Sequence, residues 1–141
     1  KVIKFKTYMT GELFEVISKH SILSHSINDK KINTKVFRNT VLKSQKRNFN
    51  FFDYLFEFRS RTLLSNKKYY PKSEIFGYLI GREIKSNFDG IGKLEVVIIG
   101  SNNNSKLYSQ AMKELKIRNT IVDSKNITIT ALSILLERFL K

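Results

Sequence analysis

The sequence predicts an α/β fold whose clearest part is a βαβα unit with two parallel strands. The apolar run Val96–Ile99 has no polar alternation, which is typical of a strand covered on both faces. A helical apolar periodicity from Asn104 to Lys116 follows, and then the short β-branched segment Thr120–Val122. This order favours a right-handed crossover and a parallel strand pair. A length of 141 residues, 41% of them hydrophobic, suits a single domain.

The first part of the chain predicts another strand and a helix. Apolar and polar residues alternate in Val2–Met9, as in a strand with one buried face. Thr10 is placed to cap a helix that runs to about Leu23, and the polar stretch Ser24–Asn33 is expected to be a loop. The inner face of the helix is expected to hold Leu13, Phe14, Ile17 and Ser21.

Three further helices are expected, over Thr34–Gln45, Phe49–Leu64 and Pro71–Asn87. The predicted inward residues of the first and third are Val36, Phe37, Thr40, Val41, Ile75, Phe76, Leu79, Ile80 and Ile84. The inward stripe predicted for the second is Phe52, Leu55, Phe56, Arg59 and Leu63. An arginine in such a stripe either forms an internal ion pair or binds an anion through two parallel hydrogen bonds, whereas Arg61 is expected to point elsewhere.

Glycines at two places predict that another segment of the chain or a ligand comes close to the backbone. Gly77 and Gly81 lie four apart inside a predicted helix, where each costs about 1 kcal/mol relative to alanine. Close packing of another backbone or of a ligand would explain them. Gly100 and Ser101 follow a predicted parallel strand, at the edge where open α/β sheets bind ligands. An ordinary strand-to-helix turn explains this pair equally well.

The last helix is expected over Ile127–Leu140. Its predicted inward residues are Ala131, Leu132, Leu135, Leu136 and Phe139. Asp89–Lys93 matches neither a complete P-loop nor a dinucleotide-binding glycine motif, so we interpret it as a turn before the strand. His20 and His25 lie five apart with no acidic cluster beside them, so no metal site is predicted, and the chain shows no catalytic constellation.

Charge and composition narrow the classes of function. Lys and Arg number 26 against 12 Asp and Glu, a net charge of +14. This excess, with Tyr54, Tyr69 and Tyr70 as rings that could stack on bases, keeps a nucleic-acid-binding module open. The absence of cysteine excludes disulfides, thiol nucleophiles and cysteine-ligated metals.

The chain is not expected to enter a membrane, and a cytoplasmic location is compatible with its composition. No apolar run approaches the roughly 18 residues that a membrane span needs. The chain begins at Lys1 without a methionine, directly in alternating residues. We therefore expect further polypeptide to precede Lys1.

Six segments, in a fixed order, point to one family. They are Tyr8–Phe14, Lys19–Leu23, Phe56–Arg59 with Leu63 and Leu64, Gly77–Ile84, Val97–Ser101, and Leu107 with Tyr108. In this order they resemble segments of the 2-dehydro-3-deoxygalactonokinases. The first segment is the most specific, and together the six cover nearly the whole chain.

The resemblance implies the sugar-kinase, hexokinase and actin superfamily, in which two ribonuclease H-like lobes close on ATP and substrate. Residues 1–141 would be the C-terminal, nucleotide-facing lobe of an actin-like ATPase fold, a mixed sheet with helical insertions that lacks its first strands. Residues 1–23 and 94–141 would form its core, and 34–87 a helical insertion. The N-terminal lobe, the phosphate loops and the acidic catalytic base would lie upstream of Lys1.

The activity that the resemblance implies is phosphorylation of 2-dehydro-3-deoxygalactonate to its 6-phosphate in galactonate catabolism, with ATP and Mg²⁺. Gly100 and Ser101 would contact the adenosine, with Gly81 at the floor of the adenine pocket. The residues expected near the sugar acid are Thr10, Gly11, Glu12 and Arg59. The isolated chain is expected to be inactive, because one lobe cannot enclose the reacting groups.

Two departures from the family pattern concern the nucleotide side. Ser133 stands where a glycine is expected, and Asn102–Asn104 replaces more hydrophobic residues. Each departure bears on the fine geometry of nucleotide binding. A kinase-like lobe without activity is a separate alternative, beside the nucleic-acid-binding one.

Overall fold

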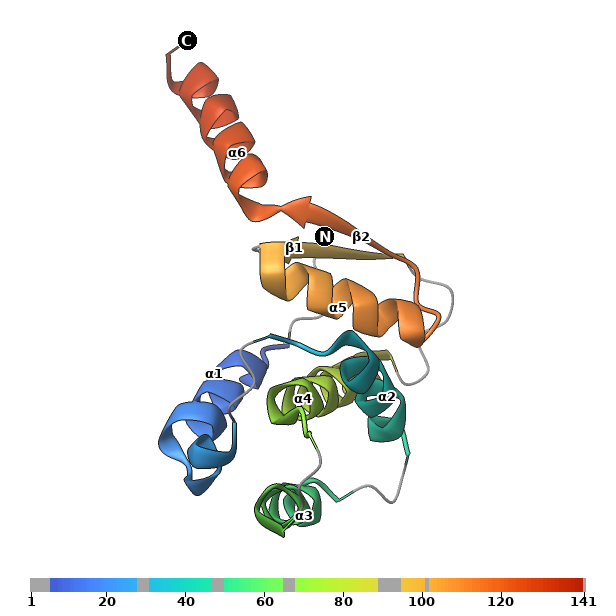
Figure 1. Ribbon diagram of the computed structural model, residues 1–141. Helices are drawn as coiled ribbons and strands as arrows, with labels where there is room; N and C mark the ends of the chain where they lie inside the picture. The colour runs from blue at the N-terminus through green and yellow to red at the C-terminus, as the bar shows by residue number, and fades with distance from the viewer. Residues whose placement is uncertain are drawn as a thin grey trace. The chain divides into compact units, whose positions relative to one another are not determined.

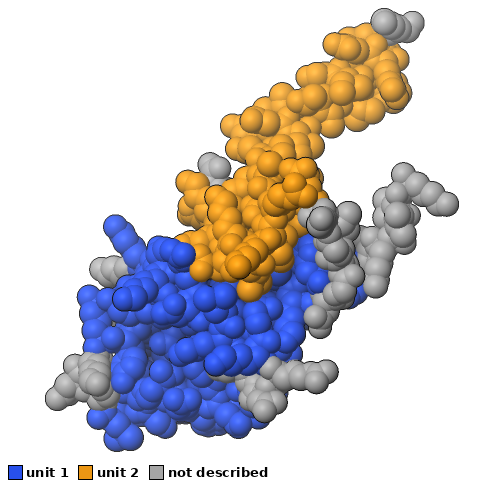
Figure 2. Space-filling view, turned by 90° about the vertical axis from the view of Figure 1, so that its right-hand side faces the viewer, with its two compact units in different colours: residues 1–90 blue, residues 91–141 orange. Residues whose placement is uncertain are grey.

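The computed structural model describes residues 6–27, 31–46, 50–64, 68–88, 95–100 and 102–140. The chain divides into two compact units, residues 1–90 and residues 91–141 (Figure 2). The described part of the first unit is helical, and the second holds a parallel two-stranded sheet with helices. The predicted α/β class is therefore confirmed. The division into a core of 1–23 and 94–141 with a helical insertion at 34–87 stays a prediction.

The first unit is organised around two packed helices, α2 (Thr34–Ser44) and α4 (Pro71–Phe88), which lie side by side (Figure 1). A Cβ on Gly77 would lie 2.7 Å from the Phe37 carbonyl oxygen, and one on Gly81 would lie 3.2 Å from Ser44 Cβ. Both glycines thus allow α2 to approach closely. The inward residues predicted for these two helices are buried or half-buried.

Polar side chains join the C-terminal end of α2 to α4. Gln45 Nε2 donates to the Gly81 carbonyl at 2.9 Å, and Arg82 Nη1 donates to the Ser44 carbonyl at 3.4 Å. Lys85 Nζ donates to the Gln45 carbonyl. Cations at this position satisfy the free carbonyls of the helix end and interact favourably with its dipole.

The predicted first helix is broken into three shorter pieces. An α-helix, α1 (Thr10–Glu15), continues as a π-helix over Val16–His20, and a 3₁₀ helix follows over Ile22–Ser26. The last piece lies partly in the predicted loop. Ile17 and Leu23 are buried in the core of this unit, with Phe58, Ile75, Tyr78 and Leu79.

Two predictions about the start of the chain need correction. Met9 occupies the N-cap position of α1, and Thr10 does not cap the helix because its hydroxyl donates to Glu83 Oε2 of α4 at 2.5 Å. Residues 6–9 of the expected strand are not in a strand, and residues 1–5 lie outside the described part. Leu13, predicted to face inward, is 41% exposed, whereas Phe14 stacks on Phe76 with ring centroids 3.6 Å apart.

Helix α3 (Phe51–Leu64) forms where predicted, but its inward face is a different one. Tyr54 and Phe58 are buried, and Phe51 stacks on Tyr78 of α4 with centroids 4.4 Å apart. The predicted stripe is largely exposed, with Phe52, Phe56 and Leu63 between 68% and 73% accessible. Both faces repeat at helical spacing, and the buried one is the face that can pack on α4.

The second unit contains the predicted parallel pair. Strands β1 (Val96–Gly100) and β2 (Asn119–Asp123) pair in parallel with Val96 opposite Asn119, and α5 (Asn102–Glu114) connects them. Helix α5 packs on both strands and buries Ala111 and Met112. The βαβ order of the prediction is confirmed.

Two expectations of burial in this unit are wrong. Strand β1 is covered on one face, because Val96, Ile98 and Gly100 are half-buried whereas Val97 and Ile99 are 55% and 61% exposed. Helix α6 (Ser124–Phe139) begins directly after β2 and projects from the sheet, and it has no buried residue (Figure 1). Among the described residues nothing covers its predicted inward stripe, of which Leu132, Leu135, Leu136 and Phe139 are 48% to 85% exposed.

Candidate functional site

A pocket of about 230 Å³ lies at the carboxyl end of β1, where the sequence predicts a ligand site. Its lining residues are Ile98, Ile99, Gly100, Asn104, Ser105 and Tyr108. They come from the last residues of β1 and the first two turns of α5. The free amide groups of a helix N-terminus and a strand end without a side chain together suit a ligand that carries an anionic group.

Gly100 separates the strand from the helix in this pocket. A Cβ at this position would lie 3.0 Å from Ser105 Oγ, which is closer than nearly all side-chain contacts. Glycine therefore allows the first turn of α5 to approach β1. Ser101, its predicted partner in binding adenosine, lies outside the described residues.

Ser105 is a candidate that the sequence reasoning missed. It is 2% exposed, and its hydroxyl has no hydrogen-bond partner among the described residues. A buried hydroxyl without a partner is costly, so its position beside the pocket is notable. Helical spacing could have revealed it, because Ser105 is three, four and seven residues before Tyr108, Ser109 and Met112 on the inner side of α5.

Gly81, predicted at the floor of the adenine pocket, belongs to the first unit. Its open side is occupied by Ser44 and Val41 of α2. This helix packing is sufficient to explain a glycine at the position, and a role in nucleotide binding stays a prediction.

The first sugar-acid candidates lie at the start of α1. Thr10 is held by Glu83, and beside it Tyr8 Oη donates to Asn87 Oδ1 at 2.7 Å. Gly11 and Glu12 are exposed, and a Cβ on Gly11 would meet nothing within 4 Å. Packing within the described chain therefore does not explain why residue 11 is a glycine.

Arg59, the remaining candidate, is half-buried on α3 and has no hydrogen bond or ion pair to any described residue. The structure does not join it to Thr10, Gly11 or Glu12 by any hydrogen bond or ion pair within the described chain. Its role in binding the sugar acid stays a prediction.

The expectation that Arg61 points away from the core is wrong. Its Nη2 lies 3.3 Å from Glu74 Oε2 of α4, and its guanidinium stacks over the Tyr54 ring at 5.4 Å. Tyr54 Oη donates to the same carboxylate oxygen. Burial, and then the hydrogen bond to Glu74, raise the pKa of Tyr54 well above its usual range. This internal group explains why the Tyr54 side of α3 faces inward.

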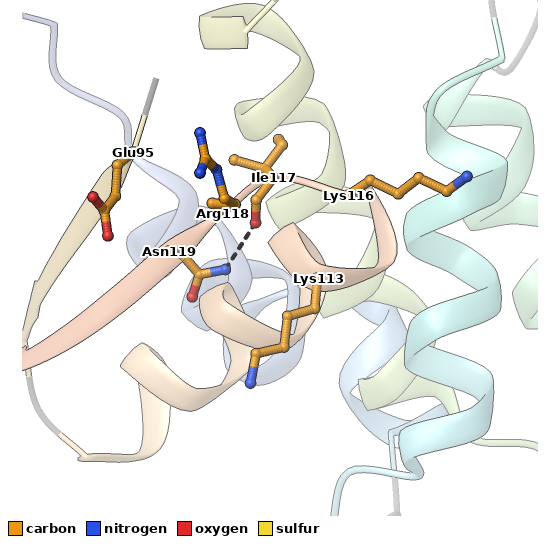
Figure 3. A pocket seen from close by; sticks show the side chains of 6 residues that line it. All are labelled: Glu95, Lys113, Lys116, Ile117, Arg118 and Asn119. Carbon is orange, nitrogen blue, oxygen red and sulfur yellow. Dashed lines mark hydrogen bonds between the residues drawn. The ribbon is translucent and has the colours of Figure 1, made fainter. Parts of the chain in front are cut away.

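A second hollow, of about 480 Å³, lies near the amino ends of the two strands (Figure 3). Lys113, Lys116 and Arg118 line it, and Asn119 donates to the Ile117 carbonyl at 3.0 Å. In Figure 3 the three cationic side chains extend in different directions. They do not converge on one point, so we do not assign an anion site to this hollow.

The described residues contain neither a metal-binding cluster nor a membrane-spanning helix. No group of three or more His, Asp or Glu side chains is arranged to hold a metal ion in the described ranges. None of the helices there combines the length and the apolar character that crossing a membrane requires.

Comparison with known proteins gives one consistent result. The sequence model of the family described as 2-keto-3-deoxy-galactonokinase matches residues 1–135. The probable 2-dehydro-3-deoxygalactonokinase DgoK1 of Rhizobium meliloti (strain 1021) is 29% identical over 138 residues, which are 94% of this chain and 45% of the relative.

A solved structure agrees with the sequence relatives. The crystal structure of a putative 2-dehydro-3-deoxygalactonokinase protein from Sinorhizobium meliloti superposes with a TM-score of 0.82 at 29% identity, covering 93% of this chain and 45% of that one. The chain thus spans about half the length of the relatives it matches. Because the family model matches residues 1–135, nearly the whole sequence, the chain belongs to the 2-keto-3-deoxy-galactonokinase family.

Proposed function

We propose that this chain is the nucleotide-facing part of an enzyme that transfers the γ-phosphoryl group of ATP to 2-dehydro-3-deoxygalactonate, giving the 6-phosphate, in galactonate catabolism. The observation that carries the proposal is the family match over residues 1–135. Phosphoryl transfer depends mainly on positioning and on charge stabilisation by Mg²⁺ and cations. Mg²⁺ would bind together with ATP. We propose that the enzyme acts in the cytoplasm.

The proposal assigns the chain to a ribonuclease H-like C-terminal lobe. The parallel β1–α5–β2 unit followed by α6 supports this, as does the fact that the relatives are about twice as long. An N-terminal lobe of the same polypeptide would supply the phosphate loops and the catalytic base, and none of the catalytic residues is assigned to this chain. Lobe closure would exclude water from the transferred group.

ATP would bind with its adenosine at the carboxyl end of β1. The pocket beside Gly100 and the unpartnered hydroxyl of Ser105 support this placement. Gly81 and Ser101 remain proposed contacts. The sugar acid would lie near Thr10, Gly11 and Glu12, with Arg59 binding its carboxylate through two parallel hydrogen bonds.

Nucleic-acid binding is not favoured by the comparisons or by the tyrosines that first suggested it. Tyr54 is 8% exposed and bonded to Glu74. Tyr69 lies under Arg61 at 5.7 Å, and Tyr70 under Lys68 at 5.6 Å. All three rings therefore contact side chains of the same chain, and they do not form an exposed row on which bases could stack.

The first test is activity. A polypeptide that joins this chain to the upstream lobe is expected to release ADP when given 2-dehydro-3-deoxygalactonate, ATP and Mg²⁺, whereas residues 1–141 alone are expected to release none. A folded two-lobe polypeptide that turns over neither this sugar acid nor its epimer would contradict the proposal and favour a lobe that has lost activity. Turnover by residues 1–141 alone would contradict the two-lobe requirement.

The second test separates the two substrates. Gly100→Val is expected to raise the KM for ATP by about tenfold, equivalent to about 1.4 kcal/mol of lost binding, because the branched side chain would fill the approach to the backbone. Arg59→Ala is expected to raise the KM for the sugar acid and leave that for ATP unchanged. If Gly100→Val unfolds the protein, or weakens both substrates equally, Gly100 is a structural turn and not a nucleotide contact.

A further inference from the structure

The start of α1 departs from the usual rules of helix construction at three places. Met9 occupies the N-cap, and its thioether makes no capping hydrogen bond to the described residues, although threonine, a good cap, follows one position later. Gly11 lies inside the helix, where a Cβ would meet no described atom within 4 Å. The helix then continues as a π-helix over Val16–His20, a form that is often found at functional sites. Departures of this kind gather where a segment binds something as well as folds.

The Thr10 hydroxyl is held by a contact between distant parts of the chain. Its Oγ1 lies 2.5 Å from Glu83 Oε2 of α4, 73 positions away in the sequence. An ionised carboxylate only accepts hydrogen bonds, so the threonine is the donor. The proton of Thr10 is therefore directed at Glu83, and the remaining lone pair of the hydroxyl oxygen can only accept.

The segment just before α1 is attached to the same end of α4 by further hydrogen bonds. Lys6 Nζ donates to the Ser86 carbonyl at 3.4 Å. Tyr8 Oη donates to Asn87 Oδ1 at 2.7 Å and accepts from Ser86 Oγ at 3.1 Å. These bonds attach the segment to α4 without any help from residue 10. The contact between Thr10 and α4 is therefore available for another purpose, which is to orient the hydroxyl.

The chemistry of the proposed substrate matches a hydroxyl that accepts. Open-chain 2-dehydro-3-deoxygalactonate carries hydroxyls at C4 and C5, besides the C6 hydroxyl that takes the phosphoryl group. These hydroxyls can donate to Thr10, whereas the substrate carboxylate only accepts and finds no donor there. Arg59 keeps its proposed role at the carboxylate. Thr10 is half-buried, and the open space beside Gly11 leaves room for the substrate next to it.

We propose that Glu83 is a positioning residue, which fixes the Thr10 hydroxyl so that its oxygen accepts a hydrogen bond from the C4 or C5 hydroxyl of the sugar acid. The inference rests on the proposed function and adds the part of the substrate that residue 10 recognises. A side chain that is already oriented loses less freedom on binding. Loss of Glu83 should therefore weaken binding of the sugar acid and leave the chemical step unchanged.

Steady-state kinetics of the two-lobe polypeptide test the role of Glu83. Glu83→Ala is expected to raise the KM for the sugar acid by about fivefold, the effect of one hydrogen bond, with kcat and the KM for ATP unchanged. Glu83→Gln is expected to restore most of the loss, because its amide oxygen can still accept from Thr10. A Glu83→Ala variant with an unchanged KM for the sugar acid, or with both KM values raised equally, overturns the proposal.

Tyr8→Phe is the matched control, because it removes the neighbouring hydrogen bonds to the same end of α4. It should leave the KM for the sugar acid unchanged. If the contacts only attach the segment to α4, Tyr8→Phe and Glu83→Ala should raise this KM alike, and that result would refute a positioning role. Circular dichroism of each variant establishes that the fold is kept.

Substitution of Thr10 tests the acceptor itself. Thr10→Ser keeps the hydroxyl and should keep the KM for the sugar acid, whereas Thr10→Val keeps the shape and should raise it as Glu83→Ala does. The double variant Thr10→Val with Glu83→Ala should be no worse than Thr10→Val, since Glu83 acts through Thr10. Losses that add in the double variant would show that the two residues act independently, against the proposal.

Substrate analogues identify the group that Thr10 recognises. With sugar acids that lack the C4 or the C5 hydroxyl, Thr10→Val should no longer raise the KM for one of the two. A Thr10→Val effect that persists with both analogues would show that residue 10 recognises neither hydroxyl. A parent polypeptide that phosphorylates no sugar acid would contradict the proposed function, and this inference with it, whereas an active parent with unaffected variants contradicts this inference alone.

Discussion

Helix α4 in the first unit and helix α6 in the second both carry long apolar stripes, but their surroundings differ. Ile75 of α4 is 0% exposed in the cluster that it forms with Ile17, Leu23 and Phe58. Ile80 is 1% exposed, in a helix that Gly77 and Gly81 let α2 approach closely. Leu132 and Leu136 of α6 are 54% and 60% exposed. An apolar stripe thus predicts a helix and the face that the helix prefers to bury. Whether that face is buried depends on the presence of a partner of complementary shape.

The largest effect expected from this comparison concerns truncation of one apolar side chain in each helix. Ile80→Ala should lower the free energy of unfolding by about 3 kcal/mol, because it leaves a cavity in a packed core. Leu132→Ala should change it by less than about 0.5 kcal/mol. Urea denaturation followed by circular dichroism measures both. A large loss from Leu132→Ala would mean that α6 is packed in solution.

A smaller effect is expected where the two helices of the first unit touch. Gly77→Ala adds a Cβ at 2.7 Å from the backbone oxygen of Phe37, which cannot rotate away as a flexible side chain can. The clash should outweigh the better helix propensity of alanine and destabilise the protein by about 2 kcal/mol. Thermal unfolding of the variant provides the measurement. An unchanged or higher melting temperature would show that α2 and α4 are less closely packed.

The third prediction uses pH to probe the packing of α3 on α4. The raised pKa of Tyr54 means that, above pH 10, the unfolded state loses the phenolic proton while the folded state keeps it. Stability is therefore complete below pH 10 and falls as the pH rises beyond it, by up to about 1.4 kcal/mol per pH unit from this group. Tyr54→Phe should remove this part of the decline. Identical pH profiles of the two proteins would argue against the raised pKa of Tyr54, and so against its burial beside Glu74.

The smallest effect is a gain. Gly11→Ala in α1 meets nothing within 4 Å, so it should stabilise the protein by about 0.5 to 1 kcal/mol through helix propensity alone. The same substitution should raise the KM for the sugar acid if that substrate approaches residue 11. A stabilised variant with an unchanged KM would remove Gly11 from the proposed site.

Much of the secondary structure could be predicted, because it depends on local periodicity and on residues such as Pro71 at the first position of α4. The parallel β1–β2 pair could be predicted from element order. The inward face of α3 could not, since two stripes fit the same helical period and the choice depends on Glu74, thirteen residues beyond Arg61. The exposure of α6 and of the second face of β1 could not be predicted either, because a local pattern does not show whether a partner covers an apolar face.

The candidate site was predictable to a similar degree. The edge of β1 that carries Gly100 follows from general rules for parallel sheets. The reason for a glycine at position 81 is seen only from the position of α2. The burial of Ser105 is seen only from the packing of α5 on the strands. Contacts between distant segments decided each of these cases.

The hydrogen bond from Gln45 to the Gly81 carbonyl joins residues 36 positions apart and closes a loop that contains α3. The entropy lost on closing a loop grows only with the logarithm of its length, about 0.6 kcal/mol for each doubling. Insertions in the connections on either side of α3 therefore add little to the cost of folding once α2 and α4 have docked. Lengthening these connections is therefore expected to leave the stability of the unit nearly unchanged.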